Sequence, residues 1–82
     1  MDIKEFIETG ISLCNTGIGL NEDDIKKAWE IVKAECECAH PDVNVLYSMA
    51  RRIERSKAYI KESEATISTL NSVRKIVDKE VE

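Results

Sequence analysis

Apolar residues recur every three or four positions along most of this chain, which is the spacing of one face of a helix. The pattern is most regular after Pro41, where no further proline or glycine occurs. Its heptad positions are Leu46, Met49, Ile53, Ser56, Ile60, Ser63, Ile67, Leu70 and Val77. This repeat predicts one long helix over residues 43–80 whose central contact positions are small and polar.

Two shorter helices are expected before Pro41. Residues 3–14 have one apolar face, formed by Ile3, Phe6, Ile7, Ile11 and Cys14. Residues 15–20 contain two of the three glycines and predict a loop. Asn21 is a preferred N-cap residue, so a second helix is expected over 22–39, ending before Pro41. Its apolar face consists of Ile25, Ala28, Trp29, Val32 and Cys36.

The predicted fold is therefore all-α and forms a single domain over residues 1–82. It is a three-helix antiparallel bundle, with two short N-terminal helices packed on one long C-terminal helix. Trp29 is the side chain expected to fill the core opposite the small residues Ser56 or Ala50.

The long helix should extend about 55 Å, further than its two companions can cover. An apolar strip at its C-terminal end would then be exposed, and the sequence predicts a homodimer through it. The strip consists of Ile67, Leu70, Val73, Val77 and Val81. Two alternatives remain for a monomer: the helix bends back near Ser63 or Asn71, or the strip meets a foreign partner.

Composition narrows the class of protein. The 82 residues are 43% hydrophobic and carry a net charge of −4, which argues against disorder and against general binding to nucleic acid or anionic membranes. No stretch reaches the roughly 20 apolar residues of a membrane span. The first ten residues lack the basic start of a secretory signal, so the three cysteines are expected to be reduced thiols in the cytoplasm.

One segment, Cys36-Glu37-Cys38-Ala39-His40-Pro41, contains two of the three cysteines and the only histidine. Thiols two residues apart on a helix point to opposite sides, and Pro41 ends the helix before His40 can share a face with Cys36. A zinc site needs four convergent ligands, so no metal site and no other cofactor is predicted. Without a base-orienting group, nucleophile chemistry is not expected either, and the chain is predicted not to be an enzyme.

Aromatic and basic residues form the sharpest surface feature. Tyr47, Arg51, Arg55 and Tyr59 stand four apart, with Arg52 beside them, and this spacing places them along one slightly drifting side of a helix. Tyrosine and arginine are enriched where interfaces concentrate binding energy. A second, acidic surface is expected from Glu22, Asp23, Asp24, Glu30 and Glu37.

These features predict a small acidic binding module. It would act stoichiometrically as an adaptor or inhibitor of a larger protein, for instance a nucleic-acid enzyme, as many proteins of viruses and mobile elements do. The alternative is nucleic-acid binding through the Tyr/Arg patch, with arginines on phosphates and tyrosines stacked on bases. The net charge does not favour this alternative.

Overall fold

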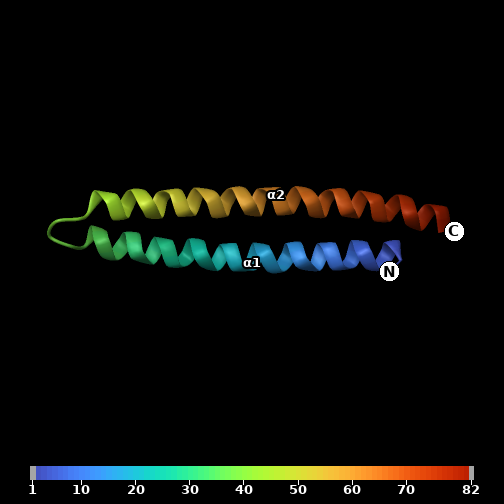
Figure 1. Cartoon of the computed structure of the whole chain (residues 1–82), viewed down its shortest axis with the longest axis horizontal. Coiled ribbons are helices and arrows are strands. Elements are labelled where there is room, and N and C mark those ends of the chain that lie inside the picture. The colour runs from blue at the N-terminus through green and yellow to red at the C-terminus, as the bar shows by residue number, and fades with distance from the viewer. Residues whose placement is uncertain (1, 82) are drawn as a thin grey trace.

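The computed structural model describes the backbone of residues 2–81 and the side chains of residues 2–80. Two α-helices, α1 (Ile3–Cys36) and α2 (Val43–Val81), lie antiparallel and are joined by residues 37–42 (Figure 1). Both termini therefore lie at the same end of a rod that measures 66 × 15 × 15 Å. A compact chain of this length has a radius of gyration of about 12 Å, whereas this one has 18.6 Å.

The all-α class is confirmed, and the three-helix bundle is wrong. The two short helices predicted over 3–14 and 22–39 are one continuous helix, α1, which passes through the predicted loop at 15–20. A heptad row runs through that segment without a break: Ile7, Ile11, Cys14, Ile18, Asn21, Ile25, Ala28, Val32 and Glu35. Each glycine costs a helix about 1 kcal/mol relative to alanine. Packing this row against α2 outweighs that cost.

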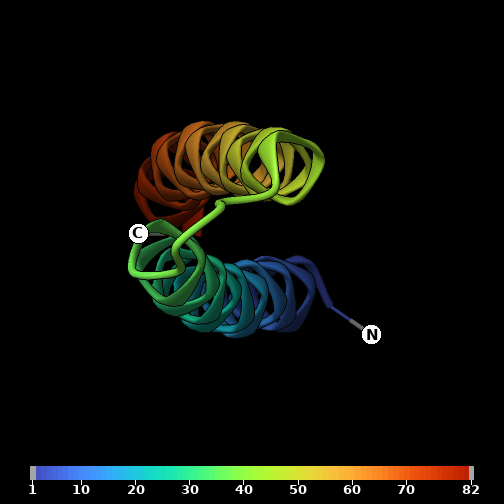
Figure 2. The same ribbon diagram turned by 90° about the vertical axis from the view of Figure 1, so that its left-hand side faces the viewer.

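The second helix agrees with the long helix predicted over 43–80. It has no interruption at Ser63 or Asn71. Facing residues of the two helices have numbers that add to about 80, as Gly10 and Leu70 or Asp24 and Ser56 do. Seen end-on, the helices sweep sideways in opposite senses, as two helices wound around each other do (Figure 2). Buried positions come from the heptad rows of both helices: Ile7, Ala28, Ile53, Ser56 and Ser63.

Because α1 has 34 residues and spans most of the rod, it also accompanies the C-terminal end of α2. Lys4 Nζ lies 3.4 Å from Asp78 Oδ1, and Gly10 lies against Leu70. The uncovered strip expected from two short helices therefore does not arise. Of its predicted members, Ile67, Leu70, Val73 and Val77 are half-buried, and the side chain of Val81 lies outside the described residues. Dimerisation through these residues stays a prediction, but the exposed strip from which it was inferred is absent from the described residues.

Trp29 is not the core residue that its size suggested. Its side chain is 47% exposed, because it lies one position beyond the heptad row at Ala28. Ala28 is buried instead, next to Ile53 in the register of the two helices. The contact between the two helices thus buries a small residue at this level, where a small side chain lets the helix axes approach closely.

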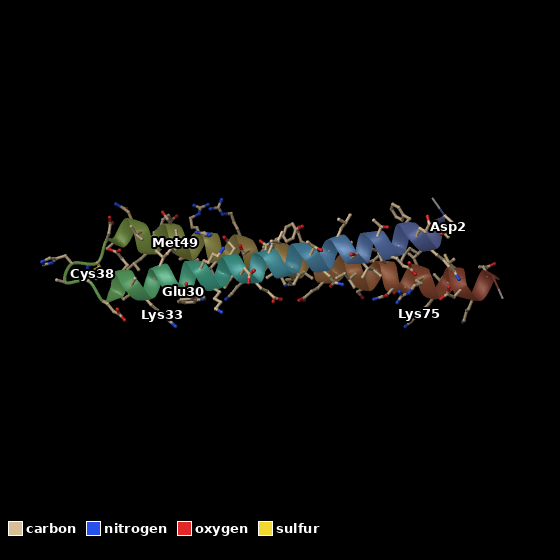
Figure 3. All side chains as sticks on the ribbon, turned by 90° about the horizontal axis from the view of Figure 1, so that it is seen from below. Asp2, Glu30, Lys33, Cys38, Met49 and Lys75 are labelled. Carbon is tan, nitrogen blue, oxygen red and sulfur yellow. The ribbon has the colours of Figure 1, made fainter. Side chains whose placement is uncertain are left out.

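Aspartate side chains cap the starts of both helices. Asp2 Oδ1 accepts from Glu5 N at 2.8 Å at the start of α1, and Asp42 Oδ1 accepts from Asn44 N at 2.9 Å at the start of α2. Glu35 Oε1 accepts from Asp42 N at 2.7 Å and thereby ties the end of α1 to the start of α2. In Figure 3, Cys38 marks this loop end, while Asp2 and Lys75 lie near the opposite end.

The two helical glycines near the middle of α1 should respond differently to alanine. A Cβ on Gly19 would meet nothing within 4 Å, whereas a Cβ on Gly17 would lie 2.7 Å from the Tyr59 hydroxyl oxygen. Gly19→Ala is expected to raise the free energy of unfolding by about 1 kcal/mol, measured by urea denaturation. Gly17→Ala should gain less, because the Tyr59 ring must move away.

Replacing Tyr59 by alanine provides the control. In a Tyr59→Ala background the two glycine substitutions should give equal gains, since the contact that separates them is gone. Equal gains already in the wild-type background would contradict the close packing of Tyr59 on Gly17.

Candidate protein-binding surface

Three residues of the predicted Tyr/Arg patch, Tyr47, Arg51 and Arg55, lie on the outer side of α2, in the half of the rod next to the loop. Tyr47 is 61% exposed, and Arg51 and Arg55 are exposed as well. Arg51 Nη1 donates to the Tyr47 hydroxyl at 3.2 Å, and its guanidinium carbon lies 5.8 Å from the ring centroid. This contact arises from the four-residue spacing and holds the two side chains together as one surface feature.

The same stretch is slightly hollowed. An open depression on α2 is lined by Tyr47, Ala50, Arg51, Glu54 and Arg55. Within the described part of the chain, neither Arg51 nor Arg55 forms an ion pair. Two guanidinium groups and a phenol thus face solvent around a small residue. We call Tyr47, Arg51 and Arg55 the ridge.

Arg52 and Tyr59, which sequence spacing grouped with the ridge, belong to the helix–helix contact instead. Arg52 Nε donates to both carboxylate oxygens of Asp24, at 3.0 and 2.9 Å, and Nη2 also contacts Oδ1. Ser56 Oγ donates to Asp24 Oδ2 at 3.2 Å. Tyr59 packs over Gly17. Arg52 directly follows Arg51 on α2, but one residue rotates the helix by about 100°, so the two arginines point to different sides.

The Asp24–Arg52 pair perturbs both ionisation equilibria. The hydrogen bond from Arg52, aided by the one from Ser56, lowers the pKa of the Asp24 carboxyl, against a smaller opposing effect of desolvation. The same hydrogen bond raises the pKa of Arg52. Each side chain remains about one-third exposed, at 33% for Asp24 and 35% for Arg52. The pair therefore lies at the edge of the contact between the two helices, which we call the seam.

The predicted acidic surface is correspondingly divided. The Asp24 carboxylate binds the Arg52 guanidinium group. The other four predicted residues are exposed, namely Glu22, Asp23, Glu30 and Glu37. Asp23 and Glu30 stand seven apart on α1 and therefore share one side of that helix, and Glu37 continues this spacing at its C-cap. They lie at the same level of the rod as the ridge, on the other helix.

The cysteine-rich segment closes α1 and forms the loop. Cys36 is the last residue of the helix, and Cys38 Sγ lies 3.5 Å from Ala34 O. Cys36, Cys38 and His40 are all exposed. Among the described residues there is no group of three or more metal-binding side chains. No described helix is long and apolar enough to cross a membrane.

Sequence reasoning did not find the partner of Arg52. The predicted break at 15–20 left the register of Asp24 relative to Arg52 undefined. A continuous helix would have placed Gly10, Gly17 and Asp24 on one heptad row. This row faces Leu70, Tyr59 and Arg52 in turn.

The Asp24–Arg52 pair should make the stability of the hairpin depend on pH in the acidic range. The folded-state pKa of Asp24 is below its unfolded value of about 4, so the unfolded chain binds more protons in that window and stability falls as pH decreases through it. Asp24→Asn should therefore reduce the fall in melting temperature between about pH 5 and pH 2, measured by circular dichroism. Asp23→Asn removes the same charge from an exposed neighbour and should leave this slope closer to that of the wild type. Equal slopes for all three proteins would contradict the assignment.

Comparison with known proteins adds no further constraint on the site. No protein-family model, curated protein or solved structure matches this chain.

Proposed function

We propose that this hairpin acts by stoichiometric binding to a larger protein, as an adaptor or inhibitor, and that the ridge of Tyr47, Arg51 and Arg55 contacts an acidic surface of that partner. The observation that carries the proposal is the exposure of two arginines without ion-pair partners in the described chain, beside an exposed tyrosine. Neighbouring Arg52, in contrast, is used internally.

The chemistry of the ridge suits a protein surface. Arginine offers a planar fork of donors to carboxylates, and tyrosine contributes large contact area with few rotatable bonds. The Arg51–Tyr47 contact already restricts both side chains, so less conformational entropy is lost on binding. Complementary charge would mainly accelerate the encounter.

The exposed acids on α1 support a protein partner over a nucleic acid. Asp23, Glu30 and Glu37 lie in the same half of the rod as the ridge. At low ionic strength a polyanion that approached the ridge would also meet their field, because the Debye length of about 30 Å at 0.01 M exceeds the 15 Å width of the rod. A protein with both acidic and basic groups could use the two sides together.

A reducing, cytoplasmic setting fits this proposal. Cys14, Cys36 and Cys38 are all free thiols. Cys14 and Cys36 are 22 residues apart on one straight helix, or about 33 Å, well beyond the reach of a disulfide.

Charge reversal on the ridge tests the proposal. The wild-type hairpin, immobilised as bait, is expected to capture a protein from an extract of the cells that make it. Arg51→Glu with Arg55→Glu should then weaken binding of the purified partner at least tenfold by calorimetry, because both donors become acceptors. The hairpin should remain folded, since both side chains are exposed.

The matched control is Lys33→Glu with Lys75→Glu, which changes the net charge equally at exposed positions off the ridge. These lysines lie in different halves of the rod (Figure 3). Equal losses for both double variants would reduce the effect to net charge and contradict a role for the ridge. A gel shift with single-stranded or duplex DNA whose affinity falls steeply with salt would favour the nucleic-acid alternative instead.

A further inference from the structure

Exposed apolar side chains gather along one edge of the rod. Among the described residues, seven of the ten large exposed apolar side chains fall there. They are Ile3, Phe6, Leu13, Leu20 and Ile31 of α1 with Tyr59 and Ile76 of α2. The remaining three, Trp29, Val43 and Tyr47, lie elsewhere. An edge of this composition is unusual on a chain that stays alone in water.

Helix geometry fixes which edge this is. The row of Gly10, Gly17 and Asp24 contacts α2, and residues four positions earlier lie about 40° further round the helix, away from the buried row. Those residues are Phe6, Leu13 and Leu20, which are 61, 67 and 66% exposed. We call them the outer row. On α2, Tyr59 and Ile76 flank the same edge, in the same half of the rod.

Charged residues follow the outer row on the loop side of the same edge. The next residue at the seven-residue spacing is Lys27, and Arg55 follows on the same edge of α2. Both are exposed. Apart from Ile31, the apolar edge therefore lies in the half of the rod that contains the chain termini, and the ridge lies in the other half.

The exposed area is large enough for a stable interface. A compact monomer of this mass exposes about 5,000 Å², whereas the hairpin exposes 6308 Å². The excess of about 1,300 Å² exceeds the roughly 800 Å² that each partner contributes to a standard protein interface. This excess follows from the extended shape of the rod, and a partner on the apolar edge could cover part of it while leaving the ridge free.

The outer row is complementary to itself. Phe6 and Leu20 stand at equal spacings of seven residues on either side of Leu13. A second α1 laid antiparallel on this row would place Leu13 against its own copy and Phe6 against Leu20, and a two-fold axis requires such reciprocal contacts. On α2, Tyr59 would then approach the level of Ile76 in the other copy.

We propose that the occupant of this edge is a second copy of the chain, and that two hairpins form an antiparallel four-helix bundle through their terminal halves, with the two-fold axis at Leu13. Lys27 lies beyond the overlap of the two α1 helices, so its charge stays apart from the Lys27 of the other copy. The loop halves then point in opposite directions and display one ridge at each end. This inference is independent of what the ridge binds.

Light scattering across a concentration series tests the dimer. The wild type is expected at twice 9.3 kDa, and Leu13→Glu with Leu20→Glu at half the wild-type mass. Both leucines are exposed within one hairpin, so the variant should stay helical. Trp29→Glu with Val43→Glu replaces exposed apolar residues off this edge and should remain dimeric. A monomeric wild type at 100 µM, a larger assembly, or loss of the dimer only in the second variant would overturn the proposal.

Engineered disulfides test the axis even if the charged variants fail to fold. In a chain with Cys14→Ala, Cys36→Ser and Cys38→Ser, Leu13→Cys should oxidise to a covalent dimer, because each copy of this residue faces the other. Phe6→Cys is the matched control. It faces Leu20, so its own copy lies about 20 Å away, beyond disulfide reach. Cross-linking of both variants, or of neither, would overturn the antiparallel arrangement.

Discussion

Each helix of this hairpin has one neighbour, and that single contact governs the rest of the structure. A helix packed on one side buries only its heptad row, so the two rows must supply nearly all the burial that opposes the conformational entropy of the chain. Among the described residues few apolar side chains are buried, namely Ile7, Ala28 and Ile53. Everything outside the rows meets water or a partner.

The seam achieves close approach with small and polar residues as well as with aliphatic ones. Gly10 accommodates Leu70, and Gly17 accommodates the ring of Tyr59. Ser56 is buried at the same level as Asp24 and donates to it. The Asp24–Arg52 ion pair adds a specific polar contact that is satisfied only in one register. A slip by one heptad would separate these partners and move Leu70 away from Gly10 and Tyr59 away from Gly17.

The two halves of the rod are suited to different contacts. The loop half combines the ridge on α2 with acidic residues on the outer side of α1, whereas the terminal half has the apolar edge around Leu13. Because the two regions are separated along a rod of 66 Å, self-association need not compete with partner binding. An antiparallel pair of rods would present two identical ridges facing away from each other, a geometry suited to bridging two partner molecules.

The sequence by itself determined the helical class, the long helix after Pro41 and the exposed Tyr47–Arg51 feature, because these depend on local spacing within one helix. It also contained the heptad row from Ile7 to Glu35, but intrinsic propensity favoured a break at Gly17 and Gly19. Only the tertiary structure decided that point: packing on α2 continues the helix through both glycines, and only then does Asp24 reach Arg52 and Tyr59 cover Gly17. Helix propensity acts residue by residue, whereas the choice between two helices and three depends on contacts between residues far apart in the chain.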